Sequence, residues 1–448
     1  MRLKPLIARF QNLLLIMVFI NSPAYSGAVV FSAGAQVGQG TQNSQIPPTN
    51  TQPVFATPTL QTTSPENIVP VPEPHVPLLL DNRKTLHLDF SIRLNSLYDV
   101  RSARQLYEQG TLDRSEDFAD ISVNNAVVLM PLLTEAPTSR ILTKTLTTTL
   151  SFAGKPCNDI NQLTRVTPDY FYGDDLLQIT IPPVTTTNLT WSFAIDVETY
   201  STYVDERALY TLTWPKEYPT VVQDGLKPEL FIESNQQIFK DAVTEVMGDE
   251  LRLTAPYLVA KRLLHYCLKH SQVSGTATRR GVSANGRTVD SLLGVNVRGA
   301  LYMLRKQGGL GSAPDLVCLC VATLRAAGIP ARPVIGLERG GGVKSRINFI
   351  VWGEFYLNGC GWIPFDPELM RRSGVASHSI DSQWKGLGSI KELNTRIPLG
   401  YHFQPPGRAT IPFYPCVWGW LPLPHKTLQV PAILNAKLYT ATQRGAQP

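Results

Sequence analysis

The chain has 448 residues, of which 43% are hydrophobic and 17% are charged, and its mean hydropathy is −0.05. That length has room for two or three domains, and that composition is typical of a globular protein and not of a membrane-embedded one. The formal net charge is only +6, and Arg2, Lys4 and Arg9 supply half of it. The remainder is nearly neutral, so the charge excludes the strongly basic surface of a nucleic-acid-binding protein.

The first 26 residues have the layout of a secretory signal peptide. A basic start is followed by an apolar stretch from Leu13 to Ile20 and then by small residues up to Ser26. Signal peptidase cleaves after this order of features, and the apolar stretch is far shorter than the ~20 residues that span a bilayer. We expect cleavage after Ser26 and an exported, periplasmic or extracellular protein with no transmembrane segment in the mature chain. An uncleaved membrane anchor is the alternative.

Residues 27–83 are predicted to be a disordered spacer rich in Gln, Thr and Pro. From Gln36 to Val76 the only charged residues are Glu66 and Glu73. A segment of this composition cannot bury enough apolar surface to offset the entropy that ordering would remove. A semi-extended spacer and a tail without a role are both consistent with it.

Residues 84–224 are predicted to form an N-terminal β-sandwich of the Ig-like type. Apolar side chains alternate with polar ones, as in the run from Leu86 to Leu94. Period-two alternation is typical of strands with one buried face, and about seven such strands suit a sandwich. The apolar runs lie at 86–94, 127–133, 141–152, 177–181 and 189–197.

Two helices are predicted after the sandwich. Ser234 starts a capping-box pattern before an apolar helix that Gly248 ends, and Thr254 stands at the start of a helix that runs to His270. The segment 275–294 is rich in Gly, Arg and Ser, which predicts a loop.

Residues 313–327 are predicted to form a helix that is buried on every side. Ser312 and Asp315 form a capping-box pattern, Pro314 suits a first helical turn, and Gly328 is a stop signal. The side chains between them are almost all apolar, so no face of this helix suits water. Strands are predicted after it at 333–337, 349–357 and 362–365, with a loop over 338–347.

Two stretches of this region resemble the bacterial transglutaminase-like superfamily. They read GSAPDLVCLCVATLRAAGIPAR, from Gly311 to Arg332, and IVWGEFYLNGCGWIPFDP, from Ile350 to Pro367. The family pattern is G-x-C-x-D, a buried helix and L-R-A-x-G-I-P-A-R, followed by H-x-W-x-E-x-Y-L-x-G-x-G-W-x-P-x-D-P. The resemblance implies a papain-like α+β domain at residues 225–410, preceded in many such proteins by a β-sandwich.

The resemblance also implies a Cys-His-Asp triad, of which this chain keeps one member. Gly311 and Asp315 bracket Ala313 at the position of the nucleophilic cysteine, Ile350 stands at the position of the histidine, and Asp366 is the acid. In triad hydrolases, loss of the nucleophile alone lowers turnover by about six orders of magnitude. We therefore predict no catalytic residue, degenerate triad positions, and a structural turn role for Asp366.

The remaining thiols and the neighbouring hydroxyl are predicted to be structural. Cys318 and Cys320 lie on the buried helix, more than one turn beyond Ala313, where cysteines are usually core residues. Ser312 is explained by the helix cap. In an oxidising compartment some cysteines can pair, in combinations that the sequence does not define. The six are Cys157, Cys267, Cys318, Cys320, Cys360 and Cys416.

No metal site or cofactor is predicted. His265 and His270 are spaced i, i+5, which is not the i, i+4 spacing of a zinc-binding pair, and the chain has no CxxC motif. The other histidines considered stand outside any motif; they are His378, His402 and His425.

Three hypotheses about function remain, and the C-terminal extension at residues 411–448 is unassigned. In the first, the chain is an exported pseudoenzyme whose groove binds a peptide, a protein or a peptidoglycan-like ligand of the cell envelope. In the second, it is a structural or assembly protein that keeps only the fold. In the third, it is an enzyme with a relocated nucleophile. Exposed aromatic residues around an open groove favour the first, and a groove closed by Ile350 favours the second. A histidine hydrogen-bonded to Ser312 or to a cysteine favours the third.

Overall fold

The computed structural model describes ten ranges of the chain, all within the compact unit Pro72–Pro448. The predicted signal peptide, most of the predicted spacer and Cys416 and His425 lie outside them. The ranges are 77–95, 121–123, 126–160, 164–171, 174–282, 288–305, 310–340, 346–403, 419–421 and 432–440.

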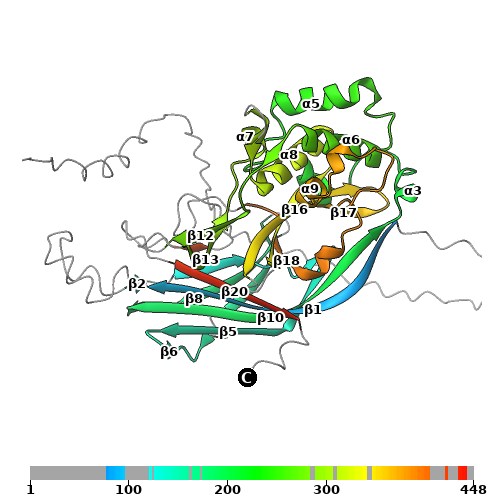
Figure 1. Cartoon of the computed structure of the whole chain (residues 1–448). Coiled ribbons are helices and arrows are strands. Elements are labelled where there is room, and N and C mark those ends of the chain that lie inside the picture. The colour runs from blue at the N-terminus through cyan, green and yellow to red at the C-terminus, as the bar shows by residue number, and fades with distance from the viewer. Residues whose placement is uncertain are drawn as a thin grey trace, which may run out of the picture. The chain divides into compact units, whose positions relative to one another are not determined.

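The largest sheet has six strands in the order β20-β1-β10-β5-β4, with β6 paired to β5, and every pair is antiparallel. β20 lies along β1 from Leu86 opposite Thr440 to Leu94 opposite Ala432, and Figure 1 shows the two side by side. Part of the segment that the sequence left unassigned is therefore an edge strand. The bounds are β1 (Leu78–Asn95), β4 (Glu135–Ala136), β5 (Ser139–Phe152), β6 (Lys155–Pro156), β10 (Asn188–Val204) and β20 (Ala432–Thr440).

A second sheet has the order β19-β3-β8-β7 and shares a hydrophobic cluster with the first. Phe90 and Trp191 of the large sheet and Met130 and Ile179 of the smaller one are at most 1% exposed and belong to that cluster. The predicted strands are confirmed, whereas the Ig-like strand order stays a prediction. The bounds are β3 (Ala126–Pro131), β7 (Thr164–Phe171), β8 (Asp174–Ile181) and β19 (Gly419–Leu421), with a separate pair of β2 (Ile121–Val123) and β9 (Val184–Thr186).

A third sheet, antiparallel in the order β17-β16-β15-β18, packs against helix α8. Its strands confirm the predicted strands of this region. The predicted loop at 338–347 is too long at both ends, because ladder pairing extends β15 to Arg339 and starts β16 at Ile347. The bounds are β15 (Ala331–Arg339), β16 (Ile347–Leu357), β17 (Gly361–Phe365) and β18 (Arg396–Gly400).

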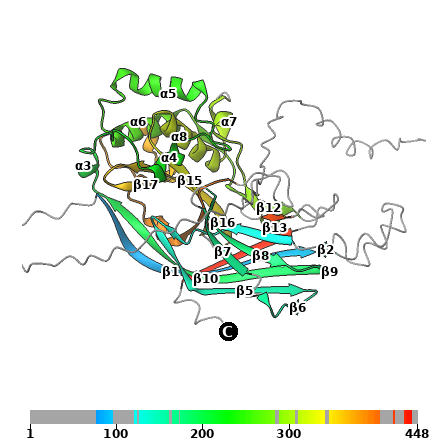
Figure 2. The same ribbon diagram turned by 180° about the vertical axis from the view of Figure 1, so that it is seen from behind.

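Helix α8 is the centre of the helical part, with α5, α6 and α7 packed on it (Figure 2). Its predicted capping box is confirmed: the backbone N–H of Asp315 donates to the hydroxyl of Ser312, and the carboxylate accepts from the backbone N–H of Ser312. The bounds are α3 (Glu206–Leu209), α4 (Thr220–Gln223), α5 (Gln237–Met247), α6 (Pro256–Lys269), α7 (Ala300–Arg305), α8 (Ala313–Ala326) and α9 (Pro367–Arg372), with 3-10 turns at 224–226, 248–250, 375–377 and 391–395.

The predicted caps of the two preceding helices are wrong. α5 begins after Gln236 and α6 after Ala255, and neither residue makes a side-chain cap hydrogen bond. At α6 the first helical residue is Pro256, which has no N–H and so leaves one donor fewer to satisfy. The end of α5 at Gly248 is confirmed, with the positive φ of 50° that favours glycine.

The predicted loop at 275–294 is also wrong. β12 (Thr278–Val282) and β13 (Thr288–Val295) pair antiparallel, and β11 (Gln272–Val273) pairs with β14 (Leu310–Gly311). The hydroxyl of Thr278 accepts from the backbone N–H of Phe349 at 2.8 Å. This long-range contact holds a segment whose own composition favours a loop.

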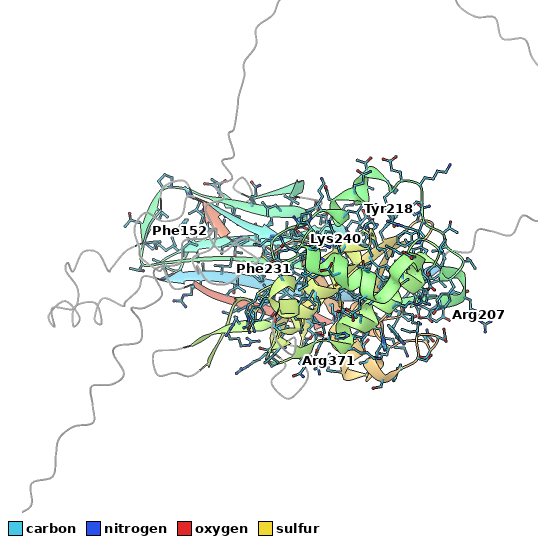
Figure 3. All side chains as sticks on the ribbon, turned by 90° about the horizontal axis from the view of Figure 1, so that it is seen from above. Phe152, Arg207, Tyr218, Phe231, Lys240 and Arg371 are labelled. Atoms are coloured by element: carbon cyan, nitrogen blue, oxygen red, sulfur yellow. The ribbon has the colours of Figure 1, made fainter. Side chains whose placement is uncertain are left out.

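The described residues form a part built mainly of strands and a part built mainly of helices. In Figure 3, Phe152 of β5 lies in the part built of the two large sheets, whereas Arg207 of α3 and Lys240 of α5 lie in the helical part.

Candidate functional site

The N-terminus of α8 carries Ala313, which the sequence matched to the position of the family's nucleophilic cysteine. Ala313 is the first residue of the helix and is half-buried. Behind it, the carboxylate of Asp315 is fully buried and accepts backbone N–H groups of Arg298 at 2.5 Å and Gly299 at 2.9 Å, besides that of Ser312. A helix N-terminus favours a thiolate. At the N-terminus of α8 the side chains are instead the methyl group of Ala313 and the buried carboxylate of Asp315.

Ile350 on β16, which the sequence matched to the position of the family's histidine, packs against apolar side chains. It is half-buried against a small hydrophobic cluster on one face of the third sheet. The residues of this cluster are Leu133, Val334, Trp352, Leu369, Ile390, Leu393 and Tyr401. A protonatable ring at this position would lose water on that side, so the local environment suits isoleucine.

Asp366 follows β17 and is almost completely buried by structural partners. Its Oδ1 accepts the backbone N–H of Leu369 at 2.8 Å, which caps α9. Its Oδ2 lies 2.8 Å from Nη2 of Arg396, outside hydrogen-bond geometry, and the side chains of this ion pair are 2% and 3% exposed. The carboxylate of Asp366 therefore has a guanidinium as its charged partner.

Arg396 lies on β18 and was missed by the sequence reasoning. Its Nε is 3.3 Å from the carboxylate of Glu338, whose pKa is raised by burial. Its guanidinium also lies 5.8 Å from the ring of Trp352, two residues from Ile350 on the same strand. The only signal in the sequence was the position of Arg396 directly before the apolar residues Ile397, Pro398 and Leu399, and the structure shows that all of β18 is buried.

The fold brings together the elements that carry the three positions. α8 packs against β15 and β16, and β16 pairs with β17 as far as Gly353 opposite Phe365, directly before Asp366. The three positions that the sequence matched to the triad thus lie at the start of α8, on β16 and directly after β17; two of their side chains are apolar and the third is ion-paired.

Four of the described cysteines are unsuited to replace the nucleophile. Cys318 and Cys320 are 0% exposed, and burial raises the pKa of both thiols well above the ordinary value. Cys267 is equally buried and lies 3.5 Å from the hydroxyl of Thr323. Burial also raises the pKa of the Cys360 thiol, to about 11. Since the thiolate is the reactive form, these thiols are weak nucleophiles near neutral pH.

Three of the described histidines that the sequence singled out bond to other groups. His265 bonds to the carbonyl of Ala376 at 3.1 Å, and His270 bonds to that of Tyr266 at 2.9 Å. His402 pairs with a carboxylate, that of Glu229. In the described ranges no histidine is hydrogen-bonded to Ser312 or to a cysteine. The same ranges contain no group of three or more His, Cys, Asp or Glu that could hold a metal, and no helix long and apolar enough to cross a membrane.

Arg332, Glu354 and Trp362, which the sequence matched to motif positions, form one cluster. Nη2 of Arg332 is 2.8 Å from the carboxylate of Glu354. The guanidinium lies 3.9 Å from the ring centre of Trp362 and 3.5 Å from that of Tyr401. The sequence offered no signal for Tyr401, which reaches the cluster from beyond β18.

Residues 251–367 match the family model of the transglutaminase-like superfamily. This range includes both motif stretches, α8 and strands β15 to β17. The chain therefore carries a transglutaminase-like domain, as the motifs predicted. No curated protein matches the chain.

Several solved structures are similar at low identity. A candidate cysteine protease from Cytophaga hutchinsonii is 13% identical, with 81% of this chain and 93% of that chain covered and a TM-score of 0.45. The periplasmic domain of TgpA from Pseudomonas aeruginosa is 15% identical, with 66% and 92% covered and a TM-score of 0.28. A candidate protease from Parabacteroides distasonis is 12% identical, with 62% and 63% covered and a TM-score of 0.20.

Proposed function

We propose that this chain is an exported transglutaminase-like pseudoenzyme that serves as a binding or scaffolding module of the cell envelope. The ion pair between Asp366 and Arg396 is the observation that carries this proposal. In a working triad the carboxylate orients an imidazole and stabilises its charged form. Here the carboxylate caps a helix and neutralises a buried arginine, while Ala313 and Ile350 supply no proton-transfer group.

The size of the expected loss in turnover distinguishes a weak enzyme from a protein without activity. Removing the nucleophile of a triad hydrolase lowers turnover by about six orders of magnitude, and removing the base has a similar effect. What remains is the binding and electrostatic stabilisation of the site, worth about three to four orders of magnitude over water in such enzymes. The buried thiols of Cys318 and Cys320 cannot replace the nucleophile without opening the core.

An activity assay tests the proposal directly. The purified chain should hydrolyse or transamidate peptide amides no faster than buffer does, before and after iodoacetamide. Ala313→Cys alone should stay inactive because no base is present. Ala313→Cys with Ile350→His should also stay near background, because Arg396 still holds Asp366. A rate clearly above buffer in the unmodified chain, lost on alkylation, would show that the chain is an enzyme.

The structural or assembly role is the second candidate, and the packing of Ile350 against the apolar cluster is the observation that supports it. Ala313→Trp distinguishes the two. If the old groove binds a peptide, a protein or a peptidoglycan-like ligand, the variant should lose its partner in a pull-down and keep its melting temperature. If the position is packed, overpacking should destabilise the chain by ~1 to 3 kcal/mol with partner recovery retained in the cold.

Export rests on the order of features in the first 26 residues. N-terminal sequencing of protein from the cell envelope should begin at Gly27. Intact Met1 in the cytosol would remove both the export proposal and the expectation of disulfides.

A further inference from the structure

A cleft lies between an edge of the six-stranded sheet and the third sheet, and it is lined by none of Ala313, Ile350 and Asp366. Its volume is about 590 Å³, within the ~300 to 1,000 Å³ of small-molecule sites. One side is formed by Glu135, Ser139 and Arg140 of β4 and β5 with Tyr200 of β10. The other side is formed by the cluster of Arg332, Trp362 and Tyr401.

The side on the third sheet is an aromatic wall that is fixed in place. The guanidinium of Arg332 lies between the rings of Trp362 and Tyr401, at 3.9 and 3.5 Å from their centres. Stacking of this kind contributes ~0.5 to 2 kcal/mol per ring. Glu354 neutralises the arginine from within the protein, because it is only 1% exposed. The wall therefore offers a half-buried indole without a net charge.

The side on the six-stranded sheet carries polar groups without protein partners. Glu135 and Arg140 face each other across the β4–β5 pair, and both are exposed. Within the described ranges neither side chain has a hydrogen bond or an ion pair. The hydroxyl of Ser139 is buried and likewise unpartnered. That oxygen has almost no accessible surface, so the polar groups that a ligand can reach on this side of the cleft are the exposed side chains of Glu135 and Arg140.

We propose that this cleft binds a neutral oligosaccharide. A sugar ring has an apolar face of C–H groups, which suits the surface of an indole, and a rim of hydroxyls that both donate and accept. Glu135 can accept from such a rim, and Arg140 can donate to it. The charges of Glu135 and Arg140 cancel. An anionic ligand would be repelled by Glu135, and a cationic ligand would be repelled by Arg140. This proposal does not depend on the pseudoenzyme proposal, since none of these residues belongs to the triad.

Calorimetric titration of the full chain tests the proposal with three probes of equal length: chitotriose, cellotriose and maltotriose. At least one should bind saturably. Its Kd should change less than about twofold when the salt concentration rises from about 0.05 M to about 0.5 M, because a neutral ligand has no charge to screen. An N-acetylated tripeptide amide represents the peptide class, and it should not bind in the same range.

Glu135→Ala and Arg140→Ala should each weaken sugar binding about tenfold, the effect of one hydrogen bond to a charged group. Both positions are exposed, so folding should be unaffected, and a melting curve checks this. Arg207→Ala is the matched control, because Arg207 is an exposed arginine on α3 outside the cleft. No saturation by any of the sugars below about 10 mM, the peptide binding in their place, or equal affinity of the cleft and control variants would overturn the proposal.

Discussion

Asp174 makes the stability of this chain depend on pH. It begins β8, is 2% exposed, and accepts the backbone N–H of Tyr401 at 2.7 Å through Oδ1. Its Oδ2 has no hydrogen-bond partner, and a Cβ added to Gly400 would lie only 2.9 Å from it. Burial raises the pKa of Asp174 from 3.8 to about 7, although the charges of His402 and Arg332 oppose the shift. Glu229 contributes a smaller repulsion in the same direction as burial.

The sign of the effect follows from proton binding. Between the unfolded pKa of 3.8 and the folded pKa of about 7, the folded chain keeps a proton on Asp174 that the unfolded chain has lost. The free energy of unfolding therefore falls as the pH rises through this window and stays low above it. At ~1.4 kcal/mol per pKa unit, the full window corresponds to ~4 kcal/mol, of which ~3 kcal/mol falls between about pH 5 and pH 8.

Asp174→Asn should remove this dependence, because the amide keeps an acceptor for Tyr401 and cannot ionise. Urea unfolding at about pH 5 and about pH 8 should show that the wild type loses ~3 kcal/mol more stability than the variant does over that interval. Asp381→Asn, at an exposed position, should keep the wild-type dependence. If Asp174→Asn shows the same pH slope as the wild type, the carboxyl is not the group responsible, and the reasoning from its burial is wrong.

Three further predictions concern stability and reactivity. Arg396→Met should destabilise the chain by ~3 to 5 kcal/mol in urea unfolding, because it leaves Asp366 buried without a cation. Adding Asp366→Asn should recover part of this loss, and equal stability of the single and double variants would contradict the prediction. Gly353→Ala should lower the free energy of unfolding by ~1 to 3 kcal/mol or more, since the added Cβ would lie 2.1 Å from the ring of Phe365. Adding Phe365→Leu should recover part of this loss, and an unchanged melting temperature of Gly353→Ala would disprove the clash. Maleimide should label Cys360 more slowly in the native chain than in the unfolded one near pH 8, since burial raises its pKa to about 11; equal rates would show that the thiol is accessible and ionised.

Local patterns predicted most of the regular structure well. The strands in 84–224 and the helix at α8 follow from alternation, capping and a fully apolar helical surface, all of which are encoded within a few residues. The capping box of Ser312 and Asp315 is present as predicted. The caps of α5 and α6 were wrong because a Ser or Thr before an apolar run is only one way to start a helix, and Pro256 provides another.

Long-range pairing accounts for the elements that the sequence missed. β20 has no partner near it in the chain, and its place beside β1 is set by a ladder between the two ends of the described chain. The hairpin of β12 and β13 has a Gly- and Arg-rich composition that favours a loop, and it is held against β16 through Thr278. Ladder hydrogen bonds of this kind depend on the neighbouring strand and not on the strand itself.

The sequence by itself determined the two motif stretches, and their spacing is what matches Ala313, Ile350 and Asp366 to the family's triad positions, an assignment that stays a prediction. Only the tertiary structure decided what surrounds them. The pairing of Asp366 with Arg396, the apolar cluster around Ile350 and the cleft beside Arg332 all join residues that are distant in the chain. Identity at a position is a local property, whereas burial, charge partners and cavities are properties of packing, and packing depends on every element that the fold brings to the same place.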